Sequence, residues 1–197
     1  MKELLIATKN KGKIREFEVL FAQFGYQVKS LLDLEDSIDV VEDGVTFREN
    51  AVKKAEAITK IFNIPTLADD SGLIVDALDG RPGVFSARYA GEGKDDKANL
   101  EKVLEELEDV SEPKRGARFY CSLALAIPGE ETIIVDGTCE GIITKEPRGE
   151  EGFGYDPIMY IPSLGKTMAQ LTKQEKNKIS HRANALKKLQ EKLASSL

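Results

Sequence analysis

Apolar residues along the chain occur in two patterns: short unbroken runs, and single positions that recur at helical intervals. The run Lys2–Ala7 predicts a buried strand, and the apolar positions of Gly12–Phe24 recur at helical intervals. Thr46–Glu49 has the pattern of a capping box and predicts a second helix, which ends at Asn63. The first part of the chain therefore predicts strands that alternate with helices.

The middle of the chain continues this alternation. The apolar run Ile64–Ala68 is followed, after a polar interruption, by Leu73–Leu78, which predicts another strand closed by a turn at Asp79-Gly80. Apolar residues at helical spacing predict a helix over Asp95–Leu107.

The last part of the chain combines a strand pair with a helical end. The β-rich runs Phe119–Ile127 and Thr132–Val135 are joined by Pro128-Gly129, and Cys139–Ile143 extends the second run after an interruption at Gly137. Thr172–Leu193 is predicted to be helical, with Ser180 as the cap of a fresh helix inside it.

This order of elements predicts an α/β fold with a mixed β-sheet flanked by helices. The 197 residues fit one domain, with room for two lobes, and the sequence shows neither an internal repeat nor a low-complexity linker. We therefore expect a single catalytic domain over residues 1–197.

Composition and charge narrow the function classes. Hydrophobic residues make up 41% and charged residues 31%, which is ordinary for a globular protein, and the net charge is −6. This charge offers no global attraction to nucleic acid or anionic membranes, and the longest apolar runs fall short of a membrane span. We expect a cytoplasmic protein, with Cys121 and Cys139 as reduced packing residues.

The most informative motif is Asp69-Asp70-Ser71-Gly72, which follows the apolar run Ile64–Ala68. Read alone, it has the composition of a turn, with Asp and Ser capping amides and Gly at a positive φ. Paired carboxylates at the end of a strand can also hold a divalent metal and deprotonate water. Glu42, which precedes the second predicted helix, is a further candidate ligand, or otherwise a solvated turn residue.

Two basic features complete a candidate phosphate site. The first predicted strand runs into Thr8–Lys13, a polar and cationic loop that leads directly into a helix. Helix N-termini bind phosphate through free amides and a partial positive charge, although a solvated basic turn has the same composition. Lys54 is either an exposed helix charge or a second phosphate contact.

The segment Gly152–Pro157 places an aromatic ring between two glycines. Phe153 can stack on a base while Asp156 accepts hydrogen bonds from ring N–H groups, or Phe153 can simply fill the core. His181 and Arg182 follow the predicted cap Ser180, so both would project from a first helical turn.

Read together, six motifs resemble the inosine triphosphate pyrophosphatase family and run in that family's order from residue 8 to residue 182. They are Thr8-x-Asn10-x-x-Lys13-x-x-Glu16, Glu49-Asn50-Ala51 with Lys54-Ala55, Ala68-Asp69-Asp70-Ser71-Gly72-Leu73, Ser86-Ala87-Arg88-Tyr89-Ala90-Gly91, Gly152-Phe153-Gly154-Tyr155-Asp156-Pro157 and Ser180-His181-Arg182. The resemblance implies an elongated, two-lobed α/β fold with a cleft between the lobes, a homodimer and a requirement for Mg²⁺.

The resemblance also implies roles for individual residues. Glu42 and Asp70 would hold the metal with Asp69 close by, and Asp70 would be the catalytic base. Phe153 would stack on the purine. The substrate-binding residues would be Thr8, Lys9, Asn10, Lys11, Gly12, Lys13, Lys54, Ser71, Phe153, Gly154, Tyr155, Asp156, Lys176, His181 and Arg182.

The implied reaction is hydrolysis of ITP, dITP and XTP to the monophosphate and pyrophosphate, with small-molecule nucleotides and not nucleic acid as partners. One alternative is a related nucleotide pyrophosphatase with a different base specificity. Another is a nucleotide-binding module without turnover, although unneutralised carboxylates would repel phosphate in such a module. The sequence leaves open whether Asp69 or Asp70 is the base.

Overall fold

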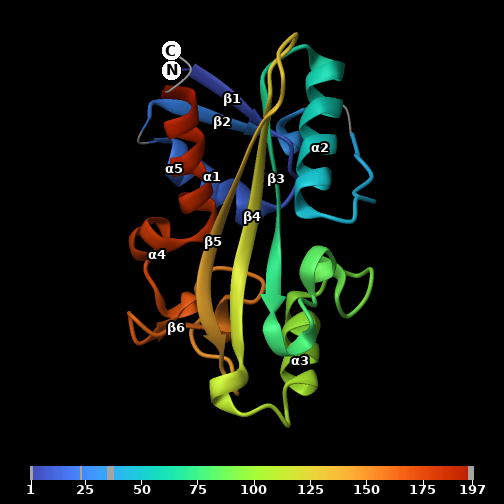
Figure 1. The fold of residues 1–197 in the computed structure, drawn as a ribbon. Coiled ribbons are helices and arrows are strands. Elements are labelled where there is room, and N and C mark those ends of the chain that lie inside the picture. The colour runs from blue at the N-terminus through green and yellow to red at the C-terminus, as the bar shows by residue number, and fades with distance from the viewer. Residues whose placement is uncertain (1, 23, 35–37, 195–197) are drawn as a thin grey trace. The chain divides into compact units, whose positions relative to one another are not determined.

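The computed structural model describes residues 2–22, 24–34 and 38–194. Within these ranges, seven strands form one sheet in the order β2-β1-β3-β4-β5-β6-β7 (Figure 1). Strand β1 is parallel to both β2 and β3, whereas β5-β6 and β6-β7 are antiparallel pairs. The predicted mixed sheet with flanking helices is therefore confirmed.

The strands and helices have the following bounds: β1 Lys2–Ile6, α1 Lys11–Ala22, β2 Tyr26–Ser30, α2 Phe47–Phe62, β3 Thr66–Val75, α3 Asp96–Glu106, β4 Gly116–Ala126, β5 Ile133–Ile143, β6 Met159–Ile161, β7 Lys166–Thr167, α4 Lys173–Ile179 and α5 His181–Ala194. None of the helices in these ranges combines the length and apolar character that crossing a membrane requires.

The chain divides into two compact units. Unit 1 comprises Met1–Asp70, Cys121–Gly137 and Ala185–Leu197, and unit 2 comprises Ser71–Tyr120 and Thr138–Asn184. The boundary between the first segments of the two units falls between Asp70 and Ser71, inside the candidate motif. Each unit therefore contains its own group of candidate site residues.

Unit 1 contains an apolar core between α2 and the sheet. Ala51, Ala55 and Ile58 of α2 are buried against residues of β3 and β4, including Ala68 and Ala124. Small alanines on both surfaces allow the helix to approach the strands closely. This packing places the buried face of α2 against β3, which carries the paired aspartates.

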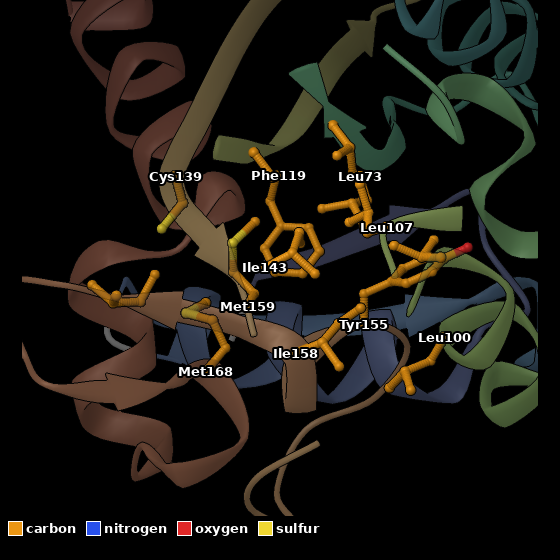
Figure 2. Packing of buried hydrophobic residues seen from close by; sticks show 14 of the residues in the cluster. Leu73, Leu100, Leu107, Phe119, Cys139, Ile143, Tyr155, Ile158, Met159 and Met168 are labelled. Carbon is orange, nitrogen blue, oxygen red and sulfur yellow. The ribbon is translucent and has the colours of Figure 1, made fainter. Parts of the chain in front are cut away.

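Unit 2 has the larger core, which Figure 2 shows from close by. Its residues come from α3, from the ends of three long strands and from the Tyr155–Leu171 region; they include Leu73, Leu107, Phe119, Cys139, Ile143, Tyr155, Ile158, Met159 and Met168. Cys121 and Cys139 are both buried free thiols, as expected, and burial raises the pKa of Cys139 to about 11.

Helix starts were predicted well because their signals are local. Thr46 Oγ1 accepts a hydrogen bond from the Glu49 amide at 3.1 Å, which caps α2. In a capping box the Glu49 carboxylate would accept from the amide of the cap residue, Thr46. It accepts instead from the amide of Val45, one residue earlier. Ser180 separates α4 from α5 and accepts from the Ala183 amide, as predicted.

Two predicted breaks in strands are wrong. Asp69-Asp70-Ser71-Gly72 is neither a turn nor a strand end, because it lies inside the continuous strand β3. Gly137 likewise interrupts nothing, since β5 runs unbroken through it. In both places neighbouring strands hold the backbone extended, whereas Asp79 and Gly80 do adopt the positive φ of the predicted turn.

Candidate functional site

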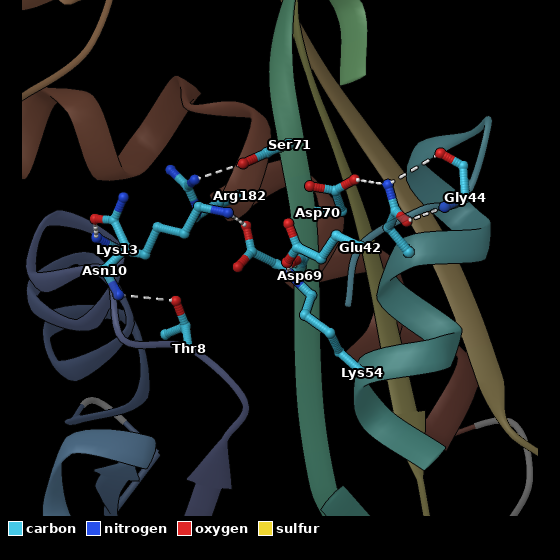
Figure 3. A network of polar contacts seen from close by, with 11 residues as sticks. Thr8, Asn10, Lys13, Glu42, Gly44, Lys54, Asp69, Asp70, Ser71 and Arg182 are labelled. Carbon is cyan, nitrogen blue, oxygen red and sulfur yellow. Dashed lines mark hydrogen bonds and ion pairs between the residues drawn. The ribbon is translucent and has the colours of Figure 1, made fainter. Parts of the chain in front are cut away.

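The loop after β1 forms a capped helix N-terminus in unit 1. Asn10 Oδ1 accepts a hydrogen bond from the Lys13 amide at 3.1 Å, and the Asn10 amide donates to Thr8 Oγ1 at 3.1 Å (Figure 3). Lys11, Gly12 and Lys13 form the first turn of α1. Thr8–Lys13 therefore holds a helix start in a defined conformation, which suits an anion-binding role.

The lysines of this loop have different neighbours. Lys13 Nζ lies 3.1 Å from Asp69 Oδ2, whose side chain is fully buried. Lys9 Nζ lies 2.6 Å from the exposed carboxylate of Asp39. Of these two lysines, Lys13 is the one that pairs with an aspartate of the Asp69-Asp70 motif.

Asp69 and Asp70 are both buried, with exposed fractions of 0% and 7%. Successive side chains of a strand point to opposite faces, and the partners of these two carboxylates follow that rule. Asp69 pairs with Lys13 of α1, whereas Asp70 Oδ2 accepts a hydrogen bond from Asn50 Nδ2 of α2 at 2.9 Å. The two carboxylates thus have different direct partners, although the charges of Lys13 and Lys54 act on both.

Lys54 links Glu42 to the strand that carries the aspartates. Its ammonium forms an ion pair with Glu42 and donates to the Asp69 carbonyl oxygen at 2.6 Å. Burial lowers the pKa of Lys54, but the charges of Asp69, Glu42 and Asp70 outweigh it and the net pKa is raised. Lys54 is therefore a buried cation beside the carboxylates that the sequence singled out.

The pKa of Asp70 is raised above its ordinary value because the carboxyl is buried. The charges of Lys54 and Lys13 and the hydrogen bond from Asn50 oppose this effect without cancelling it. A raised pKa brings a carboxylate nearer to the range in which a base is effective.

This shift predicts a stability change in the metal-free protein. The folded-state pKa of Asp70 is raised, so ionising this carboxyl costs more in the folded protein than in the unfolded chain. The free energy of unfolding therefore falls as pH rises from the ordinary carboxyl pKa through the folded value, and stays lower above it. Asp70→Asn should therefore raise the thermal unfolding temperature of the metal-free protein at neutral pH, as measured by calorimetry. An unfolding temperature of Asp70→Asn at pH 7 that is equal to or lower than that of wild type would contradict this prediction.

Carboxylates near Lys54 could supply part of the coordination shell of a metal ion. Glu42 and Asp70 supply two carboxylates to the neighbourhood of Lys54. In the described ranges, there is no group of three or more His, Cys, Asp or Glu side chains that could hold a metal by itself. Mg²⁺ typically uses one or two carboxylates and completes its shell with water and substrate phosphates.

Unit 2 holds the second group, around Phe153. The Asp156 carboxylate accepts from the Phe153 amide at 3.1 Å and forms an ion pair with Lys176 at 2.6 Å. The side chains of Asp156 and Lys176 are both buried. The carboxylate expected to meet ring N–H groups is thus engaged in fixing the loop that carries Phe153.

The half-buried ring of Phe153 lies close to two cations. Lys176 Nζ is 5.1 Å and Arg182 Cζ 5.6 Å from the ring centre, both within cation–π range. Arg182 also donates to Ser71 Oγ at 2.7 Å (Figure 3). Phe153, Lys176, Arg182 and Ser71 are therefore neighbours within unit 2, as a shared binding role requires.

Three other predicted binding residues are engaged in contacts within the protein, and two of them, Tyr155 and His181, are buried. Tyr155 belongs to the unit 2 core, its hydroxyl donates to the Ser86 carbonyl at 2.6 Å, and burial raises its pKa. His181 is buried and stacks on Phe119 with ring centres 5.0 Å apart. Gly154 donates its amide to Asp96 at 3.0 Å. Binding roles for these three residues stay predictions.

Gly152 permits the close approach of Asp156. Its φ is +80°, and a Cβ there would lie 2.0 Å from Asp156 Oδ2. Gly152→Ala should therefore displace Asp156 and also cost about 1–2 kcal/mol for the left-handed backbone. We expect a lower urea midpoint and a raised KM; Gly129→Ala, at φ +81° with open space around its Cβ, is the matched control for the backbone cost alone. Equal KM values in the two variants would contradict a role of the displaced Asp156 in binding.

Sequence reasoning gave Asn50 no role, although it quoted the residue within a motif. The side chain is 2% exposed and bonds to Gly44 as well as Asp70. Its position on the same face of α2 as Lys54, one turn earlier, was the available signal.

Comparisons with known proteins identify one family. Residues 4–192 match the profile of the Ham1 family. The chain is 64% identical over 189 residues to the dITP/XTP pyrophosphatase of Halalkalibacterium halodurans, covering 96% of this chain and 97% of the relative. It is 59% identical over 189 residues to the dITP/XTP pyrophosphatase of Bacillus subtilis, covering 96% of each chain.

Solved structures of the family share the fold. The Ham1 protein of Staphylococcus aureus superposes with a TM-score of 0.87 at 48% identity and full coverage of both chains. A HAM1 protein from Coxiella burnetii gives a TM-score of 0.87 at 43% identity, covering 99% of this chain and 100% of the other.

Proposed function

This chain belongs to the Ham1 family, and from that premise we propose that it is a dITP/XTP pyrophosphatase. It hydrolyses dITP, XTP and ITP to the nucleoside monophosphate and pyrophosphate, which removes these nucleotides from the pool. The observation that carries the proposal is the buried carboxyl of Asp70, which lies near Glu42, Lys54 and Lys13. The chain that holds this group is 64% identical to a dITP/XTP pyrophosphatase.

The loop after β1, Lys13 and Lys54 act on the triphosphate in this proposal. The capped N-terminus of α1 offers backbone amides to phosphate oxygens, and Lys13 and Lys54 neutralise charge on the leaving pyrophosphate. Mg²⁺ bound by Glu42 and Asp70 would supply further charge neutralisation and a lower pKa for bound water.

Asp70 is the proposed base. Its carboxylate takes a proton from water as the water oxygen bonds to the α-phosphorus and the bond from that phosphorus to the bridging oxygen breaks. Pyrophosphate then leaves with the electron pair of that bond. We assign this role to Asp70 because burial raises its pKa toward the range of an effective base, whereas Asp69 forms a direct ion pair with Lys13; the charge of Lys54 acts on both carboxylates.

The residues around Phe153 select the base in this proposal. Phe153 stacks on the purine, and Arg182 and backbone amides donate to the 6-keto oxygen of hypoxanthine or xanthine. Adenine presents an amino donor at that position and would leave the protein donors unpaired. A mismatch of this kind can discriminate by about 10⁴ to 10⁵. Guanine shares the 6-keto oxygen, so GTP has to be excluded at its 2-amino group.

The proposal extends to organisation and setting. We treat residues 1–197 as one catalytic domain that acts as a homodimer on small-molecule nucleotides in the cytoplasm. Mass photometry and gel filtration of the purified protein test the dimer independently of the activity.

Separate incubations with dITP, XTP, ITP, GTP, ATP and dTTP plus Mg²⁺, analysed by liquid chromatography, test the proposed function. We expect monophosphate and pyrophosphate from the hypoxanthine and xanthine nucleotides and little from the others. Equal turnover of all six would retain the phosphate chemistry and reject the base assignments, whereas intact nucleotides throughout would reject the enzyme.

A further inference from the structure

Asn50 contacts both segments that supply the proposed metal ligands. Its Oδ1 accepts from the Gly44 amide at 2.8 Å, and its Nδ2 donates to Asp70 Oδ2 at 2.9 Å and lies 3.5 Å from the Gly44 carbonyl oxygen. Gly44 lies two residues after Glu42 in the same loop. One buried side chain therefore joins the Glu42 loop to the aspartate strand.

The chemistry of this position requires a neutral side chain that both donates and accepts hydrogen bonds. A carboxylate only accepts hydrogen bonds and a backbone N–H only donates, so the group between Asp70 and the Gly44 amide needs a donor and an acceptor. Asparagine provides both without charge, and its two partners fix the orientation of the amide. An aspartate at position 50 would lose the donor and place a second carboxylate against Asp70.

The loop is shaped to fit Asn50. A Cβ on Gly44 would lie 2.7 Å from Asn50 Oδ1 and 2.8 Å from the Glu49 Cβ, so the backbone approaches as closely as it does only because residue 44 is glycine. Lys54, one helical turn later on α2, contacts Glu42 and the Asp69 carbonyl. Helix α2 therefore holds loop and strand at two points, one charged and one neutral.

We propose that Asn50 is a positioning residue: it orients Asp70 and places the Glu42 loop so that the two carboxylates are arranged for a divalent cation before that cation arrives. The inference rests on the proposed function, because it assumes that Glu42 and Asp70 are the ligands. Partners that orient metal ligands typically contribute about 10- to 100-fold to metal affinity.

The chain contains a matched control for this role. Asn99 of α3 is also 2% exposed, and its amide bonds to a loop in the same way, accepting from the Ala90 N–H at 2.7 Å and donating to the Ala87 carbonyl at 3.0 Å. Asn50 and Asn99 also occupy the same position in their helices, since each donates its backbone N–H to the cap residue's carbonyl, Thr46 or Asp95.

The experiment compares Asn50→Ala and Asn99→Ala by Mn²⁺ binding, followed by electron paramagnetic resonance on the full chain without nucleotide, and by urea unfolding. We expect both variants to lose stability, but only Asn50→Ala to weaken Mn²⁺ binding, by about 10- to 100-fold. Asn50→Ser, which retains a short hydroxyl, serves if the alanine variant fails to fold, and the same loss of affinity is expected for it.

Equal Mn²⁺ dissociation constants for wild type and the Asn50 variants, or absence of Mn²⁺ binding to folded wild type, would overturn the inference. An equal loss of Mn²⁺ affinity in Asn99→Ala would overturn it too, because the effect would then follow general loosening. Failure of the proposed function is distinguishable, since it shows as unhydrolysed dITP with wild-type protein whatever the Mn²⁺ result.

Discussion

Asp70→Asn is expected to lower kcat for dITP by about 10²- to 10⁴-fold, the usual contribution of a positioned base. The amide has the shape of the carboxylate and so leaves nucleotide binding largely intact, but it takes no proton from water and is a poorer metal ligand. Steady-state kinetics at saturating Mg²⁺ measure this effect. Asp70→Asn is therefore expected to lower kcat and to raise the unfolding temperature of the metal-free protein.

Asp69→Asn is the comparison that assigns the base. Asp69 is equally buried but pairs with Lys13, so its loss should alter triphosphate binding through Lys13 more than it alters kcat. A larger fall in kcat for Asp69→Asn than for Asp70→Asn would exchange the two roles. Near-native kcat in Asp70→Asn would remove Asp70 from the chemistry.

Phe153→Ala is expected to raise KM for dITP through lost stacking. Base–aromatic stacking contributes about 1–3 kcal/mol, which corresponds to roughly 5- to 150-fold. The ring lies near the cations Lys176 and Arg182, and its truncation leaves the Asp156–Lys176 ion pair in place because Asp156 bonds to the backbone of residue 153. The effect should therefore appear in KM and not in folding.

Phe85→Ala is the matched control for this prediction. Phe85 is an exposed ring of unit 2 with the Arg88 guanidinium 5.2 Å from its centre, so it shares the aromatic–cation pairing without the proposed base contact. We expect its KM to stay close to that of wild type, because the exposed ring has no proposed contact with the nucleotide. An unchanged KM in Phe153→Ala would make Phe153 a packing residue.

Local signals predicted the helices and two of their caps, Thr46 and Ser180. Asp95 was predicted only as the first residue of its helix. All three act as caps in the structure, because each side chain accepts from an amide three residues ahead, a contact that depends on neighbouring residues alone. The family resemblance and the mixed α/β sheet were likewise readable, since both rest on motif order and element order.

The environment of the paired aspartates was beyond local signals. Two carboxylates after an apolar run predict the end of a strand, yet β3 continues through them between its neighbouring strands. The buried carboxylates are tolerated there because Lys13, Lys54 and Asn50 reach them from two helices. These partners lie 15 or more residues away in sequence, and only the fold brings them together. The engagement of Asp156 with Lys176 was hidden for the same reason.

Hydrolysis of dITP in water labelled with ¹⁸O, with mass spectrometry of the products, tests the central claim most directly. Attack of water on the α-phosphorus predicts labelled dIMP and unlabelled pyrophosphate. Label in pyrophosphate would place the attack on the β-phosphorus, and dIDP with labelled inorganic phosphate would place it on the γ-phosphorus; either result would contradict the mechanism proposed for Asp70.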